Sequence, residues 1–236
     1  MDCCWGCAGW CWPAVPPPSP ASLAANDPYE AFNRASLKRN ARIDKHVVIP
    51  AVEAYFSLVP EDGREGVHNF LGNLALPTIF LNDMMQGEVS RGGKSMWRLV
   101  VNSTIGLGGF LDPASKMGIP RHGEDFGQTL AVWGVGEGPY LILPLLGPSN
   151  PRDAAGLAVD TVIDPTNQIR FNQHIWWSAG RQFFTLLDLK GQTYQTVQGI
   201  ERSSVDYYSS LRSFYRQFRA EQVRNGRKTG EDLPDF

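Results

Sequence analysis

The sequence predicts a mainly α protein. Apolar residues recur at helical spacing through most of the chain, proline and acidic residues mark repeated helix starts, and no series of alternating strands is visible. The 236 residues carry a net charge of −2, so no overall field favours a nucleic acid partner. No apolar run reaches the roughly 18 residues of a membrane-spanning helix. We therefore expect a helical protein that does not cross a membrane by a helix.

Residues 1–25 are predicted to be a leader or tether. All four cysteines lie in the first eleven residues, and a proline-rich stretch follows them. The CxxC spacing is compatible with a redox or zinc site, but no second ligand pair follows, so no metal site is predicted. The other interpretation is a truncated lipoprotein signal, because Cys7 stands between the small residues Gly6 and Ala8. In that interpretation Cys7 is the candidate lipidation site.

The folded domain is predicted to span residues 26–222, with a flexible polar tail at 223–236. Asp27 is a favourable N-cap and Pro28 suits the first helical position, so a helix is expected from there to about Asp44. A basic stripe on this helix is compatible with an anionic surface or with a solvated face; it consists of Arg34, Lys38, Arg42 and Lys45. Further helix starts predict four segments: Pro50–Leu58, Pro60–Leu74, Pro77–Gly87 and Arg91–Ile105.

A glycine-rich apolar segment, Asn102–Leu146, then interrupts the helical pattern. Glycine and proline recur in it every few residues, and both are unfavourable inside a helix. The segment is predicted to contain a short helix, Glu124–Trp133, and an extended stretch, Tyr140–Leu145, with room for a hairpin. Three helices are expected after it: one from Pro151 to Ile163, then Ile175–Leu189 and Thr193–Glu221.

No catalytic or cofactor motif stands out. The glycine motifs lack the strand–GxGxxG–helix context and the following Lys-Ser/Thr of nucleotide-binding loops, so no cofactor is predicted. The histidines show no metal-ligand spacing. His122 beside Glu124 and Asp125 leaves a hydrolase as a remote alternative, although such a loop is more often simply solvated. The glycines suit either tight structural turns or a mobile loop beside an apolar passage.

Two adjacent indoles, Trp176 and Trp177, point to different sides of one predicted helix. Tryptophan is favoured at membrane interfaces, where its ring is half buried and its N–H is wet. A domain core with one partly exposed indole fits this pair equally well.

Four motifs in order resemble the MlaA/VacJ family of Gram-negative outer-membrane lipoproteins. They are DPYEAFNR at 27–34, NFLGNLALP at 69–77, NSTIGLGGFLD at 102–112, and FGQTL at 126–130 followed by GVGEGPY at 134–140. The resemblance spans about residues 26–160, and the helical remainder is compatible with it.

The resemblance implies a compact ring of helices in the inner leaflet of the outer membrane, with an amphipathic central channel. It implies a non-enzymatic protein that removes mislocalised phospholipid from the outer leaflet and passes it to a periplasmic lipid carrier, beside porin trimers. The resemblance places lipid gating at the first helix and the glycine-rich loop. By motif this role falls on Phe32, Asn33, Asn102, Gly106, Gly108, Gly109, Gly134, Gly136 and Gly138.

Two other functions remain open beside lipid transport. The first is a porin-associated structural or adaptor lipoprotein without transport activity. The second is the lipid-modifying hydrolase that would use His122.

Overall fold

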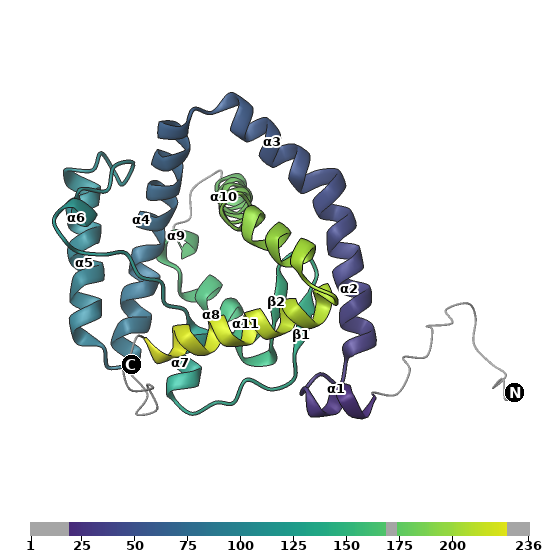
Figure 1. Ribbon diagram of the computed structural model, residues 1–236. Coiled ribbons are helices and arrows are strands. Elements are labelled where there is room, and N and C mark those ends of the chain that lie inside the picture. The colour runs from purple at the N-terminus through teal and green to yellow at the C-terminus, as the bar shows by residue number, and fades with distance from the viewer. Residues whose placement is uncertain (1–18, 169–173, 226–236) are drawn as a thin grey trace, which may run out of the picture.

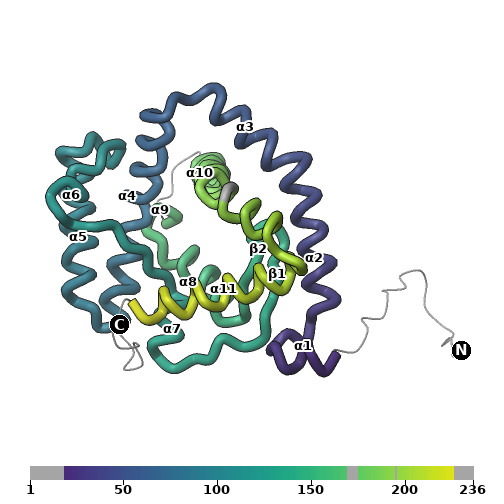
Figure 2. The backbone as a smooth tube through the Cα atoms, in the orientation of Figure 1, coloured from purple at the N-terminus to yellow at the C-terminus, as the bar shows by residue number. Residues whose placement is uncertain are grey.

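The computed structural model describes residues 19–168 and 174–225, and it confirms the mainly α prediction. Its helices form a ring-like arrangement in which α2 and α3 continue over the top into α4, while α7 and α11 close the lower side (Figure 1; Figure 2). Helix α10 runs inside this ring and contacts both α3 and α4. The elements are α1 (Pro20–Ala24), α2 (Glu30–Ile43), η1 (Asp44–Val48), α3 (Ile49–Leu58), α4 (Glu61–Met85), α5 (Val89–Thr104), α6 (Pro113–Lys116), α7 (Phe126–Val132), β1 (Leu141–Leu143), β2 (Gly147–Ser149), α8 (Pro151–Ile163), α9 (Pro165–Gln168), α10 (His174–Ser203) and α11 (Tyr207–Arg224).

The sequence left room for a hairpin near the end of the glycine-rich segment, and one is present, with its second strand just after Leu146. Strands β1 and β2 pair antiparallel, with Leu141 opposite Ser149 and Leu143 opposite Gly147. The short helix predicted before it is α7, and Asp125 caps it by accepting a hydrogen bond from the backbone N–H of Gln128. The structure also places α1 inside the segment expected to be a leader, with Ser19 as its N-cap.

The N-cap prediction for Asp27 is wrong. Helix α2 begins at Glu30, after Tyr29, and no side chain caps it. Asp27 is instead fully buried, and it accepts hydrogen bonds from Asn33 (2.9 Å) and Arg212 (2.8 Å). The hydroxyl of Tyr208 on α11 also donates to it. These charge-assisted partners are stronger than a local cap, so the carboxylate is used to join the two ends of the fold.

Pro77 does not begin a new helix, which corrects the division predicted there. It lies inside α4, a single helix from Glu61 to Met85. An interior proline removes one backbone hydrogen bond, but α4 is held on either side of it by tertiary contacts. Asn73 donates to Ser103 on α5 (3.0 Å), and Asn82 donates to Asp160 on α8 (2.9 Å). Packing against neighbouring helices therefore overrides the local signal.

The predicted boundary between the last two helices is also wrong. Helix α10 runs without a break through Gly191 to Ser203, and α11 begins at Tyr207, capped by Asp206. A Cβ atom on Gly191 would lie 2.8 Å from the ring of Phe56 on α3. Gly191 is thus a point of close helix–helix contact.

Most of the buried side chains among the described residues are polar or charged. Among the described residues 21 polar or charged side chains are buried, against 10 hydrophobic ones. The hydrophobic core is divided into two small clusters. One contains Val48, Val52 and Leu187; the other contains Tyr140, Ile142 and Tyr208. Polar networks must therefore supply much of the packing between elements.

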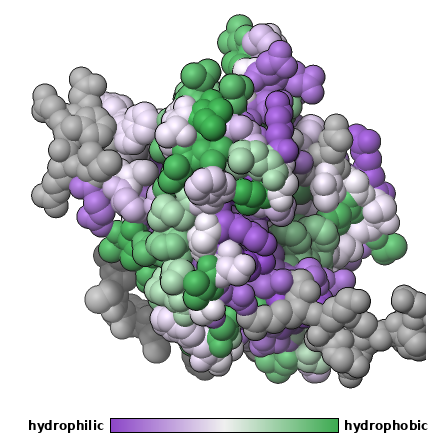
Figure 3. Space-filling view, turned by 90° about the vertical axis from the view of Figure 1, so that its left-hand side faces the viewer, coloured by the Kyte–Doolittle hydropathy of each residue, from purple (hydrophilic) through white to green (hydrophobic). Residues whose placement is uncertain are grey.

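Large hydrophobic side chains lie outside instead. On α5, Trp97 is 52% exposed and Val89 is 63% exposed, and the space-filling view of this side shows a broad hydrophobic patch beside a hydrophilic region (Figure 3). On α10, Trp176 is 79% exposed and Trp177 is 40% exposed. Neither indole of this pair is a buried core residue. No helix in the described ranges is both long and apolar enough to cross a membrane.

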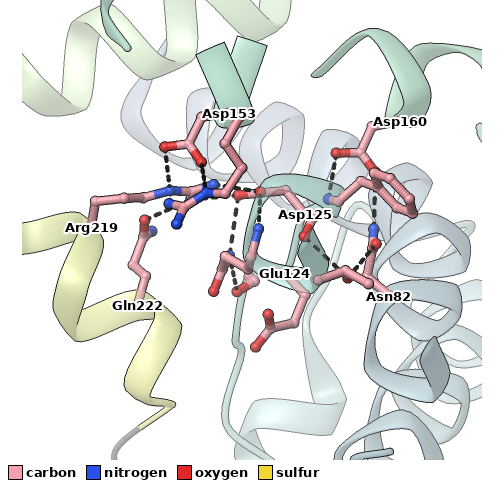
Figure 4. Close-up of polar contacts among 12 residues, drawn as sticks. Asn82, Glu124, Asp125, Asp153, Asp160, Arg219 and Gln222 are labelled. Carbon is pink, nitrogen blue, oxygen red and sulfur yellow. Dashed lines mark hydrogen bonds and ion pairs between the residues drawn. The ribbon is translucent and has the colours of Figure 1, made fainter. Parts of the chain in front are cut away.

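The lower side of the ring is closed by a charged cluster around Arg219. This α11 residue bonds both carboxylate oxygens of Asp125 (2.6 Å each) and Oδ2 of Asp153 on α8 (2.8 Å) (Figure 4). Burial alone raises the pKa of each carboxyl group, but hydrogen bonds from Arg219 outweigh this and hold both pKa values below their usual range. Both carboxylates therefore remain ionised down to acidic pH.

The hairpin is fastened to α2 by Asn33. Its side chain is fully buried, donates to the carbonyl oxygen of Tyr140 (2.9 Å) and accepts from the backbone N–H of Ile142 (2.9 Å). Asn40, two turns further along, does the same for Leu143 and Leu145. A buried amide that satisfies two backbone groups is costly to remove, because both groups are left without partners.

We predict that Asn33→Ala lowers the free energy of unfolding by about 2–4 kcal/mol, since it orphans one backbone N–H and one carbonyl. Denaturant unfolding in detergent, followed by circular dichroism, measures this. Lys38→Ala on the exposed face of the same helix is the control and should change stability by less than about 0.5 kcal/mol. Equal stability of the two variants would contradict the bridging role.

We further predict that Arg219→Gln moves acid unfolding to higher pH. The lowered pKa values of Asp125 and Asp153 contribute stability that is present above the unfolded pKa and is lost as pH falls through the folded pKa. Without the guanidinium both pKa values rise, so that loss begins at a higher pH. A pH titration followed by circular dichroism tests this. Arg224→Gln, which removes an exposed charge from the same helix, should leave the midpoint unchanged.

Candidate functional site

A cavity of about 460 Å³ lies between α4, α5, α10 and the loop after α6. Its apolar wall comes from α4, which also contributes His68 and Asn73 to the lining, and consists of Leu71, Ala75, Leu76 and Ile79. Polar and charged side chains line the rest, among them His68, Asn73, Arg98, Asn102, Arg121, His122, Arg181 and Asp188. The space is thus amphipathic, which is the kind of interior that the ring-like fold class was expected to have.

Asparagines of α4 position the first glycine loop beside this cavity. Asn73 donates to the carbonyl of Gly108 (3.4 Å), and Asn69 donates to that of Phe110 (3.4 Å). The ring of Phe110 also stacks on Phe70, with centroids 4.9 Å apart. The loop is therefore attached to the helix that supplies the apolar wall.

The glycines of this loop serve its tight geometry. Gly108 and Gly109 have φ angles of +74° and +102°, which side chains rarely adopt. A Cβ atom on Gly109 would lie 2.6 Å from Cβ of Asn73, and one on Gly106 would lie 2.4 Å from the carbonyl oxygen of Asn102. Only at Gly108 is the surrounding space open. The close packing around Gly106 and Gly109 therefore explains why glycine stands at both positions.

Asn102 is the one predicted site residue that lines the cavity itself. Its amide nitrogen donates to Asp112 (3.0 Å), and its oxygen accepts from the backbone N–H of Ala114 (3.1 Å). These bonds hold the segment after the glycine loop against α5.

The other predicted site residues lie elsewhere. Gly134, Gly136 and Gly138 belong to the turn after α7, where the carbonyl of Gly138 accepts from Asn26 (2.8 Å). Phe32 is 45% exposed on α2, and Asn33 holds the hairpin. None of these five lines the cavity, so the structure does not bring the two glycine groups together. Cys7 falls outside the described residues.

Three arginines of the cavity were not predicted from the sequence. Arg98 is almost completely buried and forms a bidentate ion pair with Asp112 (2.9 and 2.7 Å). Arg121, from the loop after α6, also reaches Asp112 (3.3 Å). Arg181 of α10 pairs with Asp164 (2.5 Å). The sequence offered one usable signal, since Arg98 lies one helical turn before Asn102 and shares its face.

Asp112 is the anionic centre of this wall. Burial raises the pKa of its carboxyl group, but hydrogen bonds from Ser115, Arg98 and Asn102 outweigh that effect and hold the pKa well below its usual range. The group is therefore ionised at all physiological pH values, and one carboxylate faces two guanidinium groups.

The hydrogen bonds of His122 do not form the Ser–His–Asp arrangement of a serine hydrolase. Its Nε2 atom lies 2.9 Å from Asp83 and 3.2 Å from Ser95, so the same ring nitrogen faces both groups. A catalytic triad uses the two different nitrogens for these partners. Ser95 is also completely buried and donates directly to Asp83 (2.8 Å). Within the described ranges no group of three or more metal-binding side chains is found.

Comparison with known proteins gives the class of this fold. The model of the MlaA lipoprotein family matches residues 25–222. A solved structure from work on the structural basis for maintenance of bacterial outer membrane lipid asymmetry superimposes with a TM-score of 0.73 and 31% identity, over 84% of this chain and 98% of that one. The helical ring is thus the fold of a known lipoprotein class.

Relatives of similar length agree. The intermembrane phospholipid transport system lipoprotein MlaA of Escherichia coli K12 is 32% identical over 206 residues, which cover 85% of this chain and 79% of the relative. An uncharacterised protein of Rickettsia bellii is 30% identical over 199 residues, covering 84% and 77%. The chain belongs to the MlaA lipoprotein family.

We predict that Gly109→Ala destabilises the protein more than Gly108→Ala. Each alanine must adopt a positive φ, which costs about 1–2 kcal/mol, but only the Gly109 variant also forces a Cβ atom against Asn73. Unfolding free energies of the matched pair measure the difference. Equal values would contradict the close packing of this loop on α4.

Proposed function

We propose that this protein transports phospholipid between membranes without enzymatic activity. It removes mislocalised phospholipid from the outer leaflet of the outer membrane and passes it to a periplasmic lipid carrier, with the cavity as part of the route. The single observation that carries the proposal is the amphipathic cavity between α4 and α10, in a chain related to named phospholipid-transport lipoproteins.

The lining of the cavity suits a lipid. Leu71, Ala75, Leu76 and Ile79 offer an apolar wall for acyl chains, while the facing side carries arginine and histidine side chains. Ligand sites of this kind combine an apolar wall with a few polar groups that orient the ligand. The apolar exterior supports residence in one leaflet, because helices satisfy their own backbone groups in lipid.

The remaining parts of the proposal follow the family resemblance. Residues 26–222 form the transport domain, preceded by a leader at 1–25 with Cys7 as the candidate anchor and followed by a polar tail at 223–236. Porin trimers are the proposed neighbours in the membrane. The proposed gating residues are the two glycine groups with Phe32, Asn33 and Asn102. Of these, Asn102 lines the cavity, and the carbonyl of Gly108 accepts a hydrogen bond from the cavity-lining Asn73.

Filling the cavity tests the function. Ala75→Trp places an indole on the apolar wall, and we predict that it abolishes transport. The chain, fused to a lipoprotein signal, is expressed in a Gram-negative strain that lacks its own family member. The amount of phospholipid exposed in the outer leaflet is then measured. The parent chain should restore the low outer-leaflet level, and Ala75→Trp should not.

Ala54→Trp is the matched control, because it adds the same side chain to the exposed face of α3. It should restore the low level of outer-leaflet phospholipid as the parent does. Porin association is measured on all three proteins by co-purification. If Ala75→Trp folds, binds porin and restores the lipid level fully, the cavity is not the route. If the parent chain itself binds porin but never restores the lipid level, the protein is an adaptor.

A further inference from the structure

Two guanidinium groups of the cavity meet at one carboxylate. Arg98 and Arg121 share the single carboxylate of Asp112, so one guanidinium charge is left without an anionic partner of its own. Arg98 is the better paired of the two, since it makes two bonds to Asp112 and a third to the hydroxyl of Ser115 (3.0 Å). Arg121 therefore has the weaker carboxylate contact of the two.

The other charged side chains at the cavity also have partners. Arg181 pairs with Asp164 (2.5 Å), and His122 lies against Asp83 (2.9 Å). Asp188 contacts Nδ1 of His68 (2.8 Å), while Nε2 of the same ring accepts a hydrogen bond from Arg121. The ring of His68 therefore connects Asp188 to Arg121.

Arg121 is held ready beside the cavity rather than buried in an ion pair. Its side chain is 31% exposed, and its contact with Asp112 is a single one of 3.3 Å. Neutral acceptors hold the rest of the group: Oδ1 of Asn69 (2.7 Å) and Nε2 of His68. Gly72 leaves the space for it, because a Cβ atom there would lie 3.1 Å from Nη1 of Arg121. A guanidinium placed in this way keeps donors for a bidentate contact with an anion.

We propose that Arg121 binds the phosphate group of the phospholipid while the acyl chains lie along the apolar α4 wall. This inference rests on the proposed function and adds the residue that orients the lipid. The phosphodiester carries one negative charge, opposite in sign to that of the guanidinium. Arginine suits such a group because its planar fork meets two phosphate oxygens at once. Arg98 acts on the lipid only by positioning Asp112, and through it Arg121.

Binding of three short-chain probes to the purified protein in detergent tests the proposal. The probes are dihexanoylphosphatidylglycerol, dihexanoylglycerol without phosphate, and inorganic phosphate. Arg121→Gln should weaken binding of the phospholipid by roughly tenfold to a hundredfold, the equivalent of one lost charge-assisted contact. It should leave binding of the neutral dihexanoylglycerol unchanged. Arg121→Lys keeps the charge but loses the fork, and should fall between the two.

Arg39→Gln is the matched control, because it removes the same charge from an exposed position on α2. It should bind the phospholipid as the parent does. Equal binding of the phospholipid by Arg121→Gln and Arg39→Gln would overturn the proposal. Inorganic phosphate bound as tightly as the phospholipid would also overturn it, by identifying a general anion site. Thermal unfolding of Arg121→Lys and Arg121→Gln shows whether each variant is folded.

Failure of this inference is distinguishable from failure of the proposed function. If only the inference fails, Arg121→Gln restores the low level of outer-leaflet phospholipid, while Ala75→Trp does not. If the proposed function fails, Ala75→Trp restores it too.

Discussion

The fold depends on buried polar side chains that must find partners in distant parts of the chain. A buried amide or carboxylate left without a partner is costly, so each one specifies where a neighbouring element lies. Asn33 holds the hairpin against α2, and Asp27 joins the beginning of the domain to α11. Arg219 closes the lower side of the ring by binding carboxylates that precede α7 and lie in α8. Each of these hydrogen bonds requires one particular geometry, a restriction that hydrophobic packing alone does not impose.

These buried polar contacts explain how a ring of helices is stable with so little apolar core. The two hydrophobic clusters are small, while many large apolar side chains, such as Trp97 and Trp176, lie on the outside. In water such a distribution would be unfavourable. In a leaflet the lipid covers the apolar exterior, and the polar networks between helices are shielded from competing water. Polar contacts inside and apolar side chains outside are consistent with one another in that setting.

The cavity follows from the same constraint. Helix α4 presents apolar residues on one face and asparagines on another, and the asparagines hold the glycine loop in place. The helix that lines the cavity is therefore also the one that anchors its border. Asp112 links this border to α5 through Arg98 and Asn102. Positive charge at Arg121 and the apolar wall of α4 then face the same space, which gives the cavity its two-sided character.

The sequence by itself determined the helical class, the hairpin, the start of α8 and the family, because these depend on local signals. Helical spacing, caps and glycine turns act over a few residues and can be seen along the chain. The motifs around Asn33, Asn102 and Gly108 were recognisable for the same reason.

Only the tertiary structure decided the rest. Asp27 binds Arg212 instead of capping a helix, and Pro77 lies inside α4. Helix α10 continues past the predicted boundary, and Gly191 within it packs against Phe56. In each case a partner distant in sequence outweighed a local preference. Arg121 was missed because its role depends on a carboxylate and a cavity wall that folding brings to it, and no spacing along the chain encodes their meeting.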